Sequence, residues 1–215
     1  MQTQVYLLLD MTGSMQPKKQ ETIDACNEYI QALQSDPHTS DFVFSLGVFN
    51  SNIGLERVVT QQPIQKVQVL SHEQYQPAAS TPLFDAIAGA AKDLEQWHGP
   101  VLFIIQTDGE ENCSRNAKRE DIVKLVADNT KAGWQFVYLG CDLDAMKAGA
   151  ALGVAAGSTM SYAGGQSVST MARVASETTR YSMRASMPVP DFFDPDADKS
   201  KQKLVAEKQR RRRYS

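Results

Sequence analysis

Carboxylate and hydroxyl side chains in this sequence have the types and the spacing to bind a hard cation. Asp10, Thr12 and Ser14 alternate in a short segment directly after the apolar residues 5–9, and Gly13 permits a tight turn there. In such a turn the alternate positions can curl around one point. Oxygen ligands of this kind suit Mg²⁺ or Mn²⁺, whereas zinc prefers the histidine and cysteine ligands that this segment lacks.

Two further candidate ligands stand far along the chain. Thr81 precedes a helical pattern, and Asp108 follows the apolar residues 101–106 in a Thr-Asp-Gly string. If the hydroxyls bind the metal directly and the aspartates bind partly through water, the ion stays under-neutralised. It would then attract a carboxylate from outside. The pattern therefore predicts a recognition site in which a metal bridges this protein and an acidic residue of a partner.

The elements that must position these residues alternate between strands and helices. Apolar runs predict strands at residues 5–9, 42–49, 54–60, 101–106, 134–139 and 158–162, and helical periodicity predicts helices at 17–34, 81–97, 117–131, 142–152 and 168–178. Such alternation predicts an α/β fold with a parallel sheet covered on both faces. Ligands of such sheets bind outside the carboxyl ends of the strands, where all five candidates fall.

The five residues resemble the von Willebrand factor A (vWA) family and its metal-ion-dependent adhesion site. The family pattern is an Asp-x-Ser/Thr-Gly-Ser loop, a distant Thr and an Asp in a Thr-Asp-Gly context, matched here in order by Asp10, Thr12, Ser14, Thr81 and Asp108. Thr12 replaces the commoner serine. The resemblance implies that the three hydroxyls bind Mg²⁺ and that the two aspartates bind it directly or through water, with Mn²⁺ or Ca²⁺ as alternative ions.

The same resemblance implies a fold, a domain and a function. It covers about residues 3–185 and implies a doubly wound, mostly parallel sheet with one antiparallel edge strand and helices on both faces. We therefore expect a vWA domain at residues 1–185. The expected function is a non-enzymatic, metal-dependent protein-binding module whose partner supplies a carboxylate. The Thr-Pro-Leu-Phe-Asp-Ala-Ile and Thr-Asp-Gly-Glu-Glu-Asn strings resemble the bacterial and phage intracellular members.

Residues 186–215 are expected to be a Pro- and Asp-rich linker with a basic tail that is flexible or binds a partner. Residues 199–215 hold eight lysines and arginines against one acid, although the whole chain has a formal net charge of −3. The tail could be a solvated end, contact nucleic acid, or lie on an acidic face of another copy. Carboxylates flanking Phe192 and Phe193 could fill the metal site of a neighbouring copy and cause self-association.

Several residues near the candidate site also have simpler roles. Asp10 and Ser14 could cap the first helix, and Thr81 is expected to cap the helix that begins after it, which is compatible with metal binding. Glu111 is expected in a solvated loop, and Asp85 is expected to interact with the N-terminus of its helix rather than with an ion.

The main alternative is a Mg²⁺-dependent hydrolase or phosphotransferase, because Asp10 follows the first strand of an α/β fold. Phosphatases of the haloacid dehalogenase type need a second acid two residues later, where this chain has Thr12, and no glycine-rich phosphate loop is present. The apolar runs are too short to cross a bilayer, and the start of the chain lacks the features of a secretory signal. Three cysteines without a CxxC pair fit a reducing cytoplasm.

Overall fold

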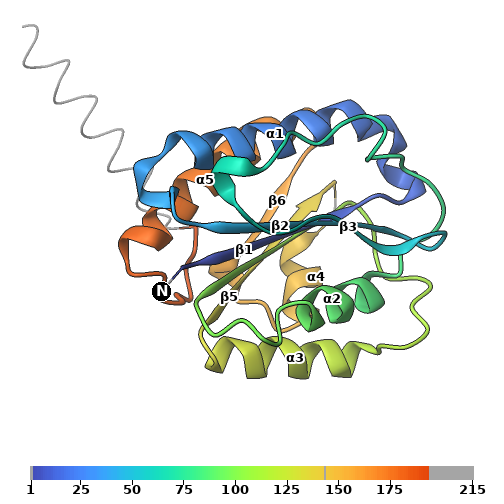
Figure 1. The fold of residues 1–215 in the computed structure, drawn as a ribbon. Helices are drawn as coiled ribbons and strands as arrows, with labels where there is room; N and C mark the ends of the chain where they lie inside the picture. The colour runs from blue at the N-terminus through green and yellow to red at the C-terminus, as the bar shows by residue number, and fades with distance from the viewer. Residues whose placement is uncertain (1, 143, 194–215) are drawn as a thin grey trace, which may run out of the picture.

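A six-stranded sheet forms the centre of the molecule in the computed structural model, which describes residues 2–142 and 144–193 (Figure 1). The strand order is β3-β2-β1-β4-β5-β6, and every strand pairs in parallel with its neighbour except β3, which is antiparallel to β2. The strands are β1 (Gln4–Asp10), β2 (Val43–Asn50), β3 (Gly54–Pro63), β4 (Val101–Thr107), β5 (Trp134–Cys141) and β6 (Thr159–Tyr162). The predicted doubly wound sheet with one antiparallel edge strand is confirmed.

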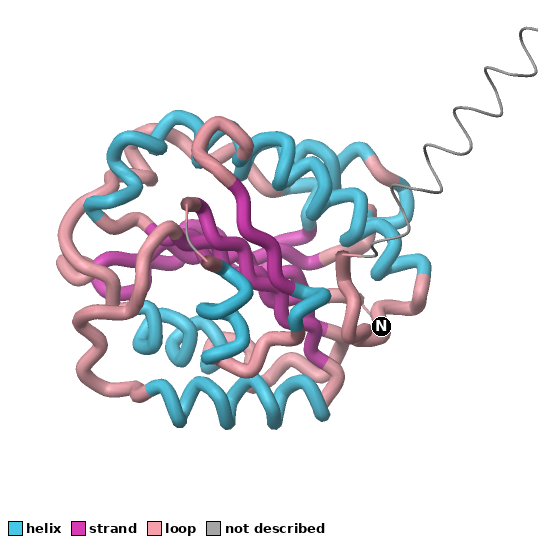
Figure 2. The backbone as a smooth tube through the Cα atoms, turned by 180° about the vertical axis from the view of Figure 1, so that it is seen from behind, coloured by secondary structure: helices cyan, strands magenta, loops and turns pink. Residues whose placement is uncertain are grey.

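Helices cover both faces of the sheet (Figures 1 and 2). The helices are α1 (Lys19–Ser35), α2 (Leu83–Lys92), α3 (Arg119–Lys131), α4 (Ala145–Ala151) and α5 (Ser167–Met183). Helices α1 and α5 lie on one face, and α2, α3 and α4 lie on the other. None of the helices within the described ranges is long and apolar enough to cross a membrane.

The central strand β1 shows why the chain adopts this layered fold. Its side chains alternate between two hydrophobic cores: Leu7 and Leu9 pack under α1 and α5, whereas Tyr6 and Leu8 pack under α2 and α3. A strand buried on both faces reads as a continuous apolar run, which is the signal present in the sequence. The chain leaves β1 toward β2 on one side and later returns as β4 on the other. The carboxyl ends of β1 and β4 therefore form the switch point of the sheet.

Helix α2 differs from the prediction at both of its ends. It begins at Leu83, and Pro82 occupies the N-cap position without making a side-chain capping hydrogen bond. Thr81 therefore lies outside the helix and does not cap it. Instead, Glu111 from the loop after β4 accepts a hydrogen bond from the Phe84 N–H at 2.9 Å. Because a distant loop supplies this acceptor, local sequence carried no sign of it.

The packed part of the chain extends past residue 185. Phe192 and Phe193 are only 2% and 7% exposed and belong to the core beneath α1 and α5. The Phe192 ring lies 6.4 Å from the Tyr181 ring of α5. Both rings are therefore buried within their own chain, whereas Asp191 directly before them is exposed. Asp194 and Asp196, the other carboxylates of the self-association hypothesis, lie outside the described residues. The basic tail, residues 199–215, lies outside the described residues.

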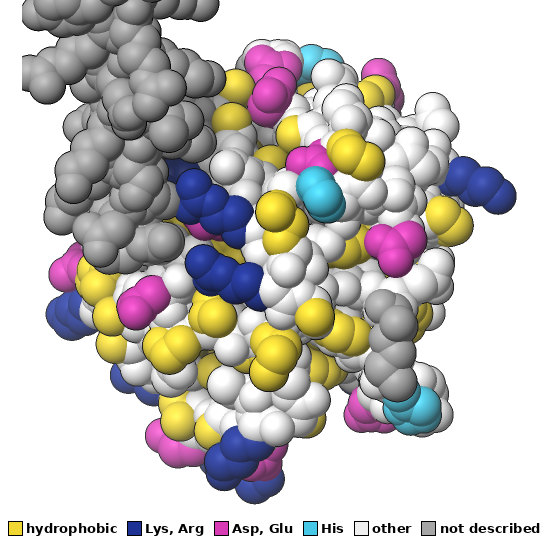
Figure 3. Space-filling model, turned by 90° about the vertical axis from the view of Figure 1, so that its left-hand side faces the viewer, with side chains coloured by type: hydrophobic (Ala, Val, Ile, Leu, Met, Phe, Trp, Pro, Cys, Tyr) yellow, Lys and Arg dark blue, Asp and Glu magenta, His cyan; other side chains and the backbone are white. Residues whose placement is uncertain are grey.

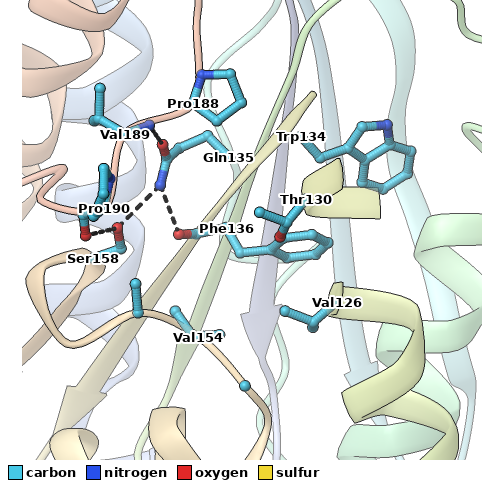
Figure 4. Close-up of a pocket in the computed structure, with 12 residues that line it drawn as sticks. Val126, Thr130, Trp134, Gln135, Phe136, Val154, Ser158, Pro188, Val189 and Pro190 are labelled. Atoms are coloured by element: carbon cyan, nitrogen blue, oxygen red, sulfur yellow. Dashed lines mark hydrogen bonds between the residues drawn. The ribbon is translucent and has the colours of Figure 1, made fainter. Parts of the chain in front are cut away.

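Polar contacts hold this C-terminal segment to the end of the sheet where the strands begin (Figure 4). The Gln135 side chain accepts a hydrogen bond from the Val189 N–H at 2.7 Å and donates one to Ser158 Oγ at 3.0 Å, and Ser158 in turn donates to the Pro190 carbonyl. A hollow of about 340 Å³ lies beside these groups. Figure 3 faces this end, where apolar side chains are exposed between basic and acidic ones. The polar groups of the hollow bind the chain itself, so they indicate a structural role.

Candidate functional site

All five predicted site residues lie at the carboxyl edge of the sheet. Asp10 is the last residue of β1, and Thr12 and Ser14 stand in the loop and 3₁₀ turn that lead into α1. Thr81 lies directly before Pro82 and α2, and Asp108 follows β4. Three loops that are distant in sequence therefore bring these residues to the switch point of the sheet.

The first loop is tightly folded around Asp10. The Thr12 N–H donates to Asp10 Oδ1 at 2.8 Å, and the hydroxyl oxygens of Thr12 and Ser14 lie 3.2 Å apart. The Gly13 N–H donates to the carbonyl of Ala79 in the loop before α2 at 2.9 Å, and a β-carbon at position 13 would stand only 3.2 Å from that carbonyl oxygen. Glycine at position 13 thus permits the close approach of two of the loops.

The loop before α2 is joined in turn to the loop after β4. The Thr81 N–H donates to Asn112 Oδ1 at 2.9 Å, and the Asn112 N–H donates to the Thr81 carbonyl at 3.1 Å. A β-carbon added to Gly109 would stand 3.4 Å from Thr81 Oγ1 and 3.9 Å from both Asp10 Oδ2 and Ser14 Oγ. Oxygen atoms from two loops and the end of β1 therefore surround a small space that the absence of a side chain at Gly109 leaves open.

Asp108 completes the group, and it contacts a residue that the sequence analysis missed. Its carboxylate accepts hydrogen bonds from Ser14 Oγ at 2.6 Å and from Lys18 Nζ at 2.7 Å, and its side chain is only 1% exposed. Lys18 Nζ also lies 3.3 Å from Asp142 Oδ2 at the end of β5. The one sequence signal for Lys18 was its place four residues after Ser14, in the segment that leads from the first strand into the first helix.

Burial and hydrogen bonding have opposite effects on the pKa values of the charged groups in the site. Burial raises the pKa of Asp10, while hydrogen bonds from Thr107 Oγ1, at 2.5 Å, and from Thr12 oppose the rise. Burial disfavours the charge on Lys18, but the hydrogen bond and negative charge of Asp108 outweigh this effect and raise the pKa of the ammonium group. The site therefore combines a partly buried cation with two buried carboxylates.

The residues present fit a small cation with oxygen ligands. The donor set is two carboxylates and three hydroxyls, and the ammonium group of Lys18 already places a positive charge on Asp108. Within residues 2–142 and 144–193, no group of three or more histidine, cysteine and acidic side chains could hold a metal ion. A metal at this position would therefore need the hydroxyls as ligands, which favours Mg²⁺, Mn²⁺ or Ca²⁺ over zinc.

Asp85 is a structural residue of the loop after β4. Its carboxylate accepts backbone hydrogen bonds from Arg115 at 2.8 Å, Asn116 at 3.0 Å and Ala117 at 2.7 Å. Asp85 stands in the first turn of α2, as predicted, and this longer-range contact is made in addition. Burial opposes ionisation of Asp85, but the three backbone donors outweigh it and lower the pKa of the carboxyl group. Asp85 thus fixes the loop that also carries Asn112.

Replacing Asp85 with asparagine should lower the free energy of unfolding by about 1–2 kcal/mol at pH 7, because charge-assisted hydrogen bonds are lost. The lowered pKa means that the carboxylate stabilises the fold above a pH of about 4 and loses this effect as the pH falls through its folded pKa. Urea denaturation of both proteins at pH 7 and pH 3 measures the difference. An equal difference at both pH values would contradict the assigned role.

A hollow of about 530 Å³ opens beside the site, between α2, α3 and α4. Buried apolar side chains, Leu83, Tyr138 and Leu152, line it together with the exposed, charged Arg119 and Lys147. Asp142, the second contact of Lys18, also borders this hollow. The hollow therefore reaches a carboxylate that contacts Lys18, although none of the five predicted site residues lines it.

Comparisons with known proteins support the fold. No protein-family model and no curated protein matches the sequence. Among solved structures, the vWF domain of the type V pili tip protein Mfa5 from Porphyromonas gingivalis matches with a TM-score of 0.60 at 10% identity, over 83% of this chain and 95% of that one. The chain has a vWA-like fold.

Two further structures match this vWA-like chain at similarly low identity. Proximal thread matrix protein 1 from the mussel byssus matches with a TM-score of 0.61 at 13% identity, over 81% of this chain. The match covers 46% of the mussel protein, so the chain spans about half of that length. The manganese-loaded TRAP protein of Plasmodium vivax matches with a TM-score of 0.56 at 16% identity, over 80% of this chain and 73% of that one. At these identities the likeness concerns the fold alone.

Proposed function

We propose that this vWA-like chain is a non-enzymatic, metal-dependent protein-binding module. Asp10, Thr12, Ser14, Thr81 and Asp108 would hold a divalent cation, Mg²⁺ before Mn²⁺ or Ca²⁺. The cation, when bound, would offer an open coordination position to a carboxylate of a partner protein. The observation that carries this proposal is the convergence of oxygen atoms of Asp10, Ser14 and Thr81 on the space beside Gly109.

The chain's own residues favour recognition over catalysis. Three of the five proposed ligands are neutral hydroxyls. If these bind the metal directly and the two aspartates bind partly through water, the ion stays under-neutralised and retains attraction for an external anion. Thr12 stands where a phosphatase of the haloacid dehalogenase type would need its second acid. The hollow beside the site provides room for the residue next to the partner's carboxylate, and its apolar lining suits an apolar side chain there.

The similar structures support the proposed class of function. Mfa5 is a pili tip protein, and the TRAP structure is manganese-loaded. Both facts concern those proteins, and they come to this chain only through a shared fold. We further propose a cytoplasmic, bacterial or phage context, supported by the free state of all three cysteines, of which Cys26 and Cys141 are buried.

Selection of a random peptide library on the immobilised protein in Mg²⁺ tests the function. Enriched peptides are expected to share an Asp or Glu and to be released by a chelator. The variant Thr81→Val, which loses one hydroxyl at nearly constant volume, should retain few of them while remaining folded. Enriched peptides without an acidic residue, or peptides that stay bound in chelator, would show that the module does not recognise a carboxylate through a metal.

A further inference from the structure

Lys18 is a charged side chain that the proposed function does not use, although it lies inside the site. Its ammonium group contacts Asp108 Oδ2 at 2.7 Å and Asp142 Oδ2 at 3.3 Å, and only 19% of the lysine side chain is exposed. The side chain of Asp108 is almost fully buried, whereas that of Asp142 is 49% exposed. The lysine therefore connects an inner carboxylate of the site to an outer one.

Both oxygens of Asp108 already have a donor. Ser14 Oγ donates to Oδ1 at 2.6 Å, and Lys18 Nζ donates to Oδ2. A divalent cation bound by Asp108 would stand close to the ammonium group, and two positive charges at such a distance repel each other strongly where water is largely excluded. A bound divalent cation would therefore oppose the contact of the ammonium group with Asp108.

Asp142 offers Lys18 a position outside the site. The Gly164 N–H donates to Asp142 Oδ1 at 2.9 Å, which holds this carboxylate in place and leaves its other oxygen directed to Lys18. Asp142 adopts a left-handed backbone conformation with φ of 53° at the end of β5. The flexible lysine side chain can thus exchange one carboxylate for the other by a small movement of its end.

We propose that Lys18 is an intrinsic cation of the site that competes with the divalent metal for Asp108 and withdraws to Asp142 when the metal binds. This inference rests on the proposed function, since it presupposes that the five ligands bind a metal. Lys18 then weakens metal affinity and stabilises the site at low metal concentration. It makes partner binding depend on a higher concentration of the divalent ion than the ligands alone would need.

The test compares Lys18→Met with Lys19→Met. Both variants lose one positive charge at neighbouring positions, but Lys19 contacts Gln76 at 2.9 Å and neither aspartate. In isothermal titration with Mg²⁺, Lys18→Met should bind about tenfold more tightly than the unmodified chain, whereas Lys19→Met should stay within about twofold. In a chelator, Lys18→Met should melt about 4 °C below Lys19→Met, and saturating Mg²⁺ should remove this difference.

The possible outcomes separate the two proposals. Metal binding of equal strength in all three proteins would overturn the role of Lys18 and leave the metal site intact. Binding by Lys18→Met alone would support the competition in its strongest form. No Mg²⁺ binding by any of the three would overturn both the metal site and the competition.

Discussion

Replacing Asp108 with asparagine is expected to weaken Mg²⁺ binding by about 100-fold or more. Loss of a residue that only supports a metal ligand typically costs about 10–100-fold in affinity, so the loss of a charged ligand should cost at least the upper end of that range. The substitution keeps the size of the side chain and an oxygen that can accept from Ser14. Isothermal titration of both proteins with Mg²⁺ measures the change.

The variant Glu110→Gln provides the matched control for Asp108→Asn. Glu110 carries the same charge in the same loop, but its side chain is exposed and it is not among the proposed ligands. Its affinity for Mg²⁺ should stay within about threefold of the original, because an exposed charge is screened by solvent. If both variants lost affinity equally, the negative charge of the loop, and not ligation by Asp108, would explain metal binding.

The strands were predictable because their environment leaves a simple pattern in the sequence. β1 and β4 are buried on both faces, and each contains five consecutive apolar residues, a run that stands out from the mixed sequence around it. The order of the elements then restricted the topology, since strand–helix–strand connections are right-handed. The end of α2 was less predictable: Leu94 is buried, but it lies in the turns after the helix ends at Lys92.

The candidate site was predictable only for residues whose position at the end of a strand or the start of a helix determines where they lie. Asp10, Thr81 and Asp108 had to meet if their strands and helix lay side by side, because they stand at the same edge of the sheet. The contact of Lys18 with Asp108 was not predictable in this way, since a lysine side chain usually extends into water. Glu111 and Asp85 accept hydrogen bonds from backbone N–H groups that are distant in sequence. These contacts also depend on tertiary packing, so the sequence did not indicate them.

In the C-terminal segment, amino-acid composition predicted a linker, but two individual residues pack into the core. Prolines and aspartates between residues 187 and 200 are typical of a linker. Phe192 and Phe193 nevertheless fill the space beside Tyr181, with their two rings packed edge to face at a centroid distance of 5.1 Å. Two large apolar side chains can attach a polar segment, because burying each of them contributes about 1.5–3 kcal/mol.

Replacing Phe192 with alanine is therefore expected to lower the free energy of unfolding by about 3–5 kcal/mol. The ring is almost completely buried, so its removal loses apolar burial and leaves a cavity that the sheet and α5 can close only in part. Urea denaturation measures this change through the shift of the midpoint at a constant slope. A slope that also changed would indicate that the C-terminal segment had detached before the rest of the domain unfolded.

Met187→Ala is the control for this prediction, because Met187 belongs to the same segment but is 65% exposed. Its effect should stay within about 0.5 kcal/mol, the range of ordinary surface substitutions. A large effect at Phe192 and a small one at Met187 would place residues 186–193 within the folding unit of the vWA-like domain. Equal and small effects would instead mean that the domain is stable without the packing of Phe192, and that its cooperative unit ends with α5.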